Sequence, residues 1–210
     1  MSITLTVNES ALHRELIRSI SRHNNANQIK NSLMVGNEKL VKKFEAMKKQ
    51  MIKEFLNLPI TREIQGGPSA SNISGTLKGY GNLFSFIGFD KTDNPLDPII
   101  NLLNQSYIRI SKPNVRGQVL VSIEIPSAKQ IFESTSLPWA PGISWAQRIE
   151  VGMSGLGYYL NTQHPGGRSG LGVQSQGKVR TGSFSNKPYI SSFIKTWKDK
   201  FSKIEKNIKL

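Results

Sequence analysis

The chain of 210 residues contains no cysteine, which excludes disulfide scaffolds, thiolate metal sites and cysteine nucleophiles. Hydrophobic residues make up only 37% of it. No stretch approaches the roughly 18 consecutive apolar residues of a membrane span. The first residues, MSITLTVNES, lack the basic region and apolar core of a secretory signal, so we expect none. The composition predicts one substantial core joined to long polar segments.

Acidic residues are also scarce. There are 14 Asp and Glu against 28 Lys and Arg, which gives a formal charge of +14 and a pI near 10.1. Such a surplus favours polyanionic neighbours, either nucleic acid or the acidic faces of other proteins. The simpler alternative is that the charge only keeps a basic domain soluble.

Groups that could carry catalysis or bind metal are few and scattered. The three histidines are His13, His23 and His164, and they show no zinc-binding spacing. Three aspartates lie close together at Asp90, Asp93 and Asp97, but they miss the spacing of a calcium loop. The glycine-rich segment 152–157 lacks the lysine of a phosphate loop, and Ser154 within it departs from the nucleophile elbow. We therefore predict that the protein is not an enzyme and holds no cofactor or metal.

The N-terminal part alternates between structured and polar segments. Residues 2–7 show the alternation of a short strand, and residues 10–20 show one apolar helical face. The asparagine-rich segment 23–32 is typical of a linker. The clearest helix is predicted over Glu38–Leu58, where apolar residues recur every three or four positions.

Lysines cover the other side of that helix. They form either a solvated face or a stripe that contacts phosphates by counterion release. No aromatic residues are interleaved with them, so base stacking of the single-strand type is not indicated. The candidate contacts to phosphate or to an acidic partner are Lys39, Lys42, Lys43, Lys49, Lys53 and Lys198.

The middle of the chain predicts a sheet. A long polar loop is expected over 59–82 and a strand over 83–89. Asp90–Pro98 is predicted as a turn and 99–103 as a short helix. Two β-branched runs, 107–111 and 118–125, flank a Pro/Asn/Gly turn and predict a hairpin. Ser127 should cap a short helix over 128–133.

The stretch Leu137–Leu160 organises the C-terminal half. A proline–glycine turn precedes Ser144, which stands where a helix N-cap would. Three glycines, Gly152, Gly155 and Gly157, interrupt the helical pattern that follows. Either another backbone packs close to them, or the helix ends near Gly152 and a loop follows. A glycine-rich loop over 161–187 then leads to Pro188, which opens a final helix with an aromatic stripe.

Together these patterns predict an α+β protein, in which an antiparallel sheet is packed by a long N-terminal helix, a central helix and a C-terminal helix. We expect residues 1–36 to form a strand–helix arm with a linker. Residues 37–210 should form a single domain with long loops at 59–82 and 161–187.

The order of four short motifs resembles the neck and tail-completion proteins of tailed bacteriophages, the family of the lambda minor tail protein Z. The motifs are the basic helix 38–58, Ser74-Gly75-Thr76-Leu77, the segment 145–152 (WAQRIEVG) and Lys187-Pro188-Tyr189-Ile190. The segment GYGNLFSFIGF also resembles virion proteins of contractile-tailed phages. The resemblance covers about residues 38–205. It departs from the family at Ser74-Gly75-Thr76, where Thr-Gly is usual, and at the long loops.

The resemblance implies a structural virion protein that forms a ring, commonly six-fold, at the head–tail junction after assembly in the host cytoplasm. Its partners would be copies of itself, a portal, adaptor or tail terminator, and DNA passing through the ring. The expected interface residues are Trp139, Trp145, Tyr158, Tyr159, Arg168, Tyr189 and Trp197. A basic, non-enzymatic nucleic-acid-binding module remains the alternative.

Overall fold

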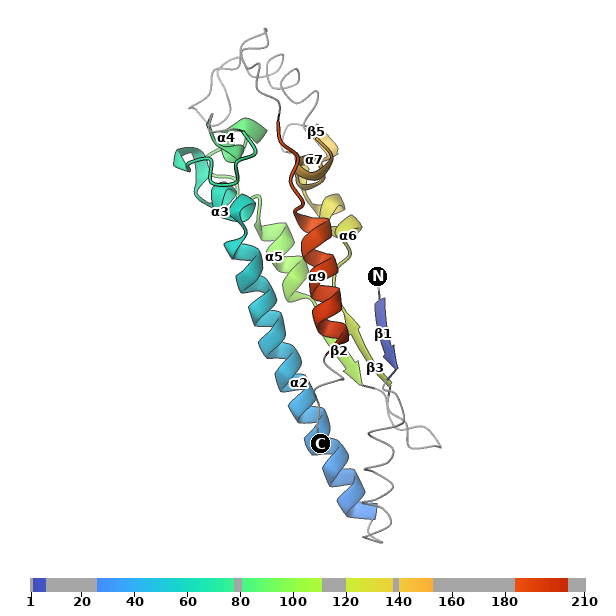
Figure 1. The fold of residues 1–210 in the computed structure, drawn as a ribbon. Coiled ribbons are helices and arrows are strands. Elements are labelled where there is room, and N and C mark those ends of the chain that lie inside the picture. The colour runs from blue at the N-terminus through green and yellow to red at the C-terminus, as the bar shows by residue number, and fades with distance from the viewer. Residues whose placement is uncertain are drawn as a thin grey trace. The chain divides into compact units, whose positions relative to one another are not determined.

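The computed structural model describes residues 2–6, 26–77, 81–110, 120–137, 140–152 and 184–203 (Figure 1). They belong to two compact units, each built from segments that are distant in the sequence. Unit 1 comprises residues 1–51, 105–126 and 195–210, and unit 2 comprises residues 52–104 and 127–194. Helices and antiparallel strands occur together, which confirms the predicted α+β class. None of the described helices is both long and apolar enough to cross a membrane.

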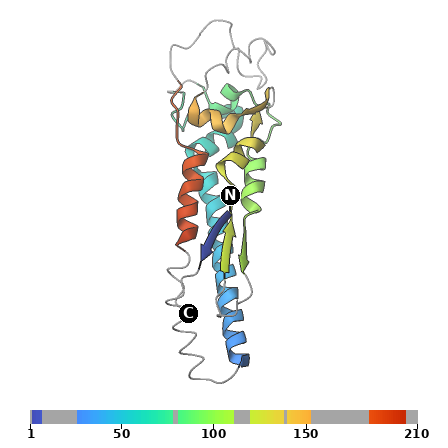
Figure 2. The same cartoon turned by 90° about the vertical axis from the view of Figure 1, so that its right-hand side faces the viewer.

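Unit 1 contains a three-stranded antiparallel sheet. Its strands are β1 (Ser2–Thr6), β2 (Tyr107–Ile110) and β3 (Leu120–Glu124). β3 is central and pairs with both neighbours, as the turned view shows (Figure 2). Glu124 lies opposite Ser2 on one side and Tyr107 on the other. The predicted hairpin and N-terminal strand are therefore confirmed, and β1 joins the sheet of unit 1.

Two helices complete unit 1. α2 (Ala26–Asn57) contributes its residues up to Met51, and α9 (Ile190–Ser202) contributes its residues from Lys195. The rings of Phe44 and Phe201 lie 5.6 Å apart between centroids and both residues are buried. Trp197 packs on Phe201 at 5.5 Å, and Val121 and Ile123 of β3 are buried as well. These apolar side chains are the core of the unit.

α2 begins earlier than predicted. Its first residue is Ala26 rather than Glu38, so most of the segment expected to be a linker is helical. Asparagine and glutamine weaken a helix but do not break it, and this stretch contains no proline. The helix predicted within residues 10–20 lies outside the described residues.

Unit 2 is mainly helical. The elements that lie wholly within it are α3 (Pro59–Gln65), η1 (Gly67–Ser69), α4 (Leu83–Ile87), α5 (Asp97–Asn104), α6 (Ala128–Ser134), β4 (Ser136–Leu137), β5 (Ala140–Ser144) and α7 (Trp145–Val151). Aromatic rings fill its core. Trp145 meets Phe89 edge-on at 5.7 Å and Tyr189 at 6.3 Å, and Tyr189 stacks on Phe55 at 6.1 Å.

Two predictions in unit 2 were wrong. Residues 59–65 were expected to be loop, but Pro59 occupies the first turn of α3, where its missing N–H costs nothing. Residues 83–89 were expected to be a strand, but 83–87 form helix α4. The Asn82 side chain accepts a hydrogen bond from Ser85 N at 2.9 Å, and Gly88 ends the helix with φ 88°. These two caps outweigh the strand propensity of the phenylalanines.

Other local predictions in unit 2 are confirmed. Ser127 and Gln130 form a capping box at the start of α6, and the Ser144 side chain caps α7 by accepting from Gln147 N. α7 ends at Val151, and Gly152 follows with φ 117°. Continuation of the helix through Gly152 is therefore wrong, and the shorter helix is correct. Gly155 and Gly157 lie outside the described residues.

Candidate functional site

Three aromatic residues expected at an interface are buried in the chain itself. The exposed fraction is 1% for Trp145, 2% for Tyr189 and 1% for Trp197. Trp145 and Tyr189 belong to the core of unit 2, and Trp197 belongs to the core of unit 1. Their predicted role as interface residues was therefore wrong, because core packing already uses their rings. The other four predicted interface residues, Trp139, Tyr158, Tyr159 and Arg168, lie outside the described residues.

The predicted lysines are at the surface of their units. Lys39, Lys42 and Lys49 are exposed on α2 in unit 1, at intervals of three and seven residues that keep them on one helical face. We call these three residues the lysine stripe. Lys43 and Lys198 are half-buried in unit 1, while Lys53 is exposed and belongs to unit 2. The opposite face of α2 in unit 1 carries the buried residues Leu40, Phe44 and Met51.

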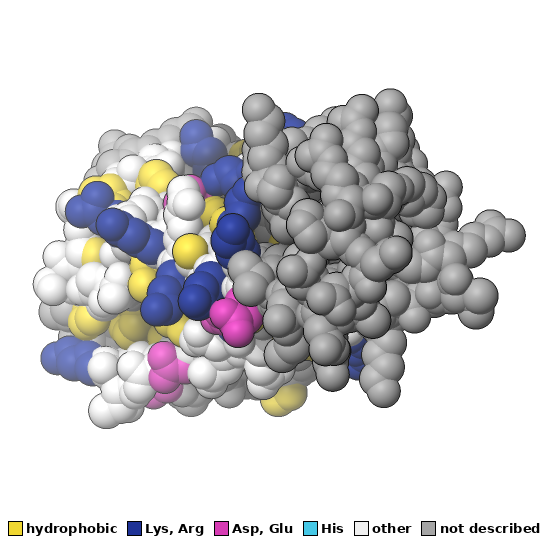
Figure 3. All heavy atoms as spheres, turned by 90° about the horizontal axis from the view of Figure 1, so that it is seen from below, with side chains coloured by type: hydrophobic (Ala, Val, Ile, Leu, Met, Phe, Trp, Pro, Cys, Tyr) yellow, Lys and Arg dark blue, Asp and Glu magenta, His cyan; other side chains and the backbone are white. Residues whose placement is uncertain are grey.

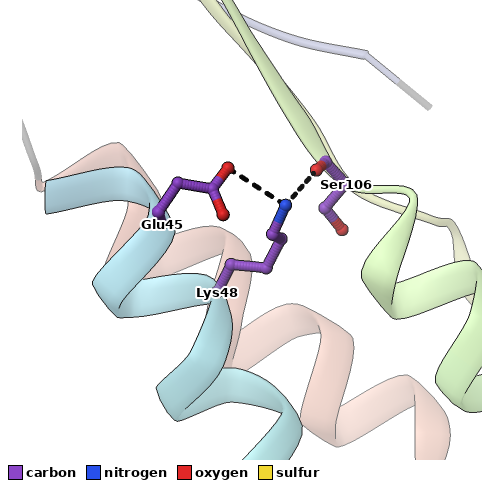
Figure 4. Close-up of polar contacts among 3 residues, drawn as sticks. All are labelled: Glu45, Lys48 and Ser106. Atoms are coloured by element: carbon purple, nitrogen blue, oxygen red, sulfur yellow. Dashed lines mark hydrogen bonds and ion pairs between the residues drawn. The ribbon is translucent and has the colours of Figure 1, made fainter. Parts of the chain in front are cut away.

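Two glutamates of α2 lie beside the stripe, Glu38 directly before Lys39 and Glu45 between Lys42 and Lys49. Glu45 is positioned to pair with Lys42 three residues before it or with Lys49 four residues after it. Its carboxylate instead accepts from Lys48 Nζ at 3.0 Å, and Lys48 also donates to the carbonyl oxygen of Ser106 at 3.3 Å (Figure 4). In the described part of the chain, the three lysines of the stripe form no ion pair.

The charge is distributed unequally between the two units. Among residues whose side chains are described, unit 1 has ten Lys and Arg against four Asp and Glu, whereas unit 2 has six against seven. Lys and Arg side chains are prominent among the described atoms seen from below, and acidic side chains are sparse (Figure 3). The excess positive charge in the described part of the chain therefore belongs to unit 1.

Unit 2 brings together two of the motifs that carry the phage resemblance. The segment 145–152 forms α7 with its terminal glycine, and Tyr189 directly precedes α9. Lys187 N donates to the carbonyl oxygen of Ile149 at 3.3 Å. The Glu150 carboxylate accepts from Ser191 N at 2.7 Å and from Ser191 Oγ at 2.6 Å. The carboxylate thereby satisfies a free N–H in the first turn of α9.

A third motif joins the same region. Thr76 is buried, and its carbonyl oxygen accepts from Ser185 N at 3.0 Å. Ser74 and Thr76 bond through their hydroxyl oxygens at 2.9 Å. Residues near positions 75, 150 and 187 are thus linked by hydrogen bonds within unit 2, although more than 100 residues separate the first motif from the last.

A buried carboxylate supports this region, and the sequence analysis did not identify it. Glu63 of α3 has no exposed surface. Its oxygens accept from Leu83 N at 2.7 Å, Ser74 N at 2.9 Å and Asn72 Nδ2 at 3.1 Å. The available signal was a glutamate between apolar neighbours, Ile60 and Ile64, on a short helix. That signal is weak, because only the tertiary fold supplies the three donors.

Among the described residues, the polar side chains of unit 2 make hydrogen bonds that join segments of the fold, whereas those of unit 1 form a basic surface. In the ranges that are described, no three His, Asp or Glu side chains come together as a metal site. In comparisons with protein-family models, curated proteins and solved structures, nothing matches this chain.

Proposed function

We propose that this protein is a structural virion subunit that forms a ring at the head–tail junction of a tailed bacteriophage. In this role it joins the portal or its adaptor to the tail and catalyses no reaction. The proposal rests on the resemblance of the four ordered motifs to neck and tail-completion proteins. It extends to copies of the same chain and to a portal, adaptor or tail terminator as partners.

One structural observation supports it most directly. In unit 2 the Lys187–Ile149 hydrogen bond joins two of the four motifs directly. The Ser191–Glu150 and Ser185–Thr76 hydrogen bonds join motif residues to residues that flank the motif 187–190. A fold shared with neck and tail-completion proteins would keep its sequence pattern at positions that pack against one another. These hydrogen bonds are what such a fold would need.

Cryo-electron microscopy of purified phage particles that carry the gene tests the proposal. We expect density for the chain as a closed ring between the portal and the tail, with each copy touching its neighbours through the same pair of surfaces. Mass spectrometry of the same particles gives the copy number relative to the portal. Absence of the chain from particles, while it is abundant in the infected cell, would overturn the proposal.

A second measurement separates the ring from the nucleic-acid-binding module. Size-exclusion chromatography with light scattering should be carried out with and without short duplex DNA. A closed oligomer that forms without DNA supports the ring. A chain that is absent from particles and oligomerises only along DNA supports the module.

A further inference from the structure

We propose that the lysine stripe of unit 1, formed by Lys39, Lys42 and Lys49, binds the phosphate backbone of duplex DNA without regard to sequence. This proposal does not depend on the ring. A monomeric chain can bind DNA in this way, and a ring subunit can do so as well.

The geometry of the stripe suits a regular polyanion. With a rise of about 1.5 Å per residue, the ten steps from Lys39 to Lys49 span about 15 Å of helix axis. Duplex DNA carries about one charge per 1.7 Å of its axis, so about nine phosphate charges lie along that length. Three ammonium groups on one exposed face can therefore each find a phosphate without a fixed register.

Among the described residues, the lysines of the stripe form no ion pair. Glu38 and Glu45 are both spaced to pair with Lys42, and Glu45 is also spaced to pair with Lys49. Glu45 instead accepts from Lys48 Nζ, which also donates to the Ser106 carbonyl oxygen (Figure 4). Lys39 and Lys42 lie three residues apart, at a spacing where like charges destabilise a helix by about 0.2–0.5 kcal/mol. An anionic ligand relieves this repulsion.

The residue types favour phosphate over a protein carboxylate. All the basic residues of α2 and α9 that are described in unit 1 are lysines. Protein–protein interfaces are enriched in arginine and depleted in lysine. Lysine binds phosphate as a point charge that needs no bidentate geometry. The stripe also lacks aromatic side chains, so a duplex fits it better than a single strand, whose bases would need stacking partners.

The proposal is tested by measuring how the full chain binds two unrelated duplexes of about 25 base pairs. Fluorescence anisotropy monitors the binding at several salt concentrations. We expect equal affinity for both sequences and a linear fall of log K with log salt. The variant K39Q/K42Q/K49Q should bind at least about tenfold more weakly near 0.1 M salt. Its salt slope should be smaller by about 0.9 for each lost contact, or about 2 to 3 in total.

A matched control removes the same charge from unit 2. The variant R62Q/K91Q/K129Q also lowers the formal charge from +14 to +11 by neutralising three exposed side chains. It should bind DNA nearly as the parent chain does. Circular dichroism and thermal unfolding establish that both variants are folded, since substitutions at exposed positions usually change stability little.

Three results would overturn the proposal. The first is no binding of duplex DNA at about 50 mM salt, where counterion release is strong. The second is an equal loss of affinity in the stripe variant and the control, since net charge alone would then be responsible. The third is tighter binding of polyglutamate than of DNA at equal charge, which would assign the stripe to an acidic protein. None of these results bears on the presence of the chain in phage particles.

Discussion

At the scale of single residues, Glu63 shows how one buried polar group can organise a segment. Its two oxygens accept three N–H groups from residues 72, 74 and 83, and the side chain has no exposed surface. Because Leu83 N lies in the first turn of α4, the carboxylate also supplies negative charge where that helix has free donors.

We expect Glu63→Gln to lower the free energy of unfolding by about 1–3 kcal/mol. Glutamine replaces one acceptor oxygen with an NH₂ group, so one buried N–H donor loses its acceptor. Urea unfolding, followed by circular dichroism, measures the free energy of unfolding. The control is Glu133→Gln on α6, where the Lys129 pair is exposed at 3.7 Å. That change should cost less than about 0.5 kcal/mol. Equal losses in the two variants would contradict the role of Glu63.

The Tyr189 hydroxyl provides a pH-dependent test. Burial raises the pKa of Tyr189 well above its usual value, while the hydrogen bond to Thr61, 3.0 Å away, lowers it and the charge of Glu150 raises it. The native chain therefore keeps this proton at a pH where the unfolded chain, with a pKa near 10, releases it. Folding stability is then lost as pH rises above about 10, by up to about 1.4 kcal/mol per pH unit.

Tyr189→Phe should lower stability near neutral pH by about 1–2 kcal/mol, because buried Thr61 loses its partner. The variant lacks the titrating group, so its deficit should shrink above about pH 10. Urea unfolding of both proteins at neutral and alkaline pH gives the difference. A deficit that stays constant across this range would show that Tyr189 ionises alike in the folded and unfolded chains.

At the scale of elements, the end of α7 depends on the backbone of Gly152 rather than on the space around it. A Cβ atom at this position would lie 3.5 Å from Asn186 Oδ1, which is an ordinary contact. The φ of 117° with ψ 148° is instead a conformation that is open to almost no other residue. The expectation that a neighbouring backbone packs close is therefore wrong for Gly152, and a backbone requirement explains the glycine.

We expect Gly152→Ala to destabilise the chain by about 1–3 kcal/mol, since alanine strains this conformation. The comparison is Gly67→Ala, where φ is 66° and nothing lies within 4 Å of a new Cβ. That left-handed conformation costs alanine about 1 kcal/mol. Thermal unfolding of both variants compares the stability lost at each glycine. A Gly152→Ala variant as stable as the parent chain would mean that α7 continues past residue 151.

At the scale of the whole molecule, the described side chains of unit 1 are strongly basic, whereas those of unit 2 are nearly balanced in charge. The repulsion within unit 1 should make stability depend on salt, because added ions screen the lysines. We expect the melting temperature of the parent chain to rise between about 20 mM and 300 mM salt, where the screening length falls severalfold.

The stripe variant K39Q/K42Q/K49Q should be at least as stable as the parent chain at low salt, and less dependent on salt. Removing the Lys39–Lys42 and Lys39–Lys43 repulsions should raise the free energy of unfolding by about 0.2–0.5 kcal/mol each. Calorimetry of the variant and of R62Q/K91Q/K129Q measures the difference. A stripe variant that is clearly less stable than both other proteins would show that these lysines stabilise the fold.

The sequence by itself determined the elements whose signals are local. The apolar period of α2, the β-branched runs of β2 and β3, and the caps at Ser127 and Ser144 depend on neighbours within a few residues, so they were predicted correctly. The sequence also determined the basic face of α2, because helical spacing fixes which residues share a side.

Only the tertiary structure decided what those elements contact. It placed Trp145, Tyr189 and Trp197 in cores rather than at a surface, although aromatic residues suit both environments. It added the distant Glu63 as an acceptor for the first turn of α4, beside the local caps Asn82 and Gly88, and it added the Ser106 carbonyl oxygen as a second acceptor for Lys48. The contacts that the tertiary structure added join residues that are distant in the sequence, and no local pattern indicates which distant groups will meet.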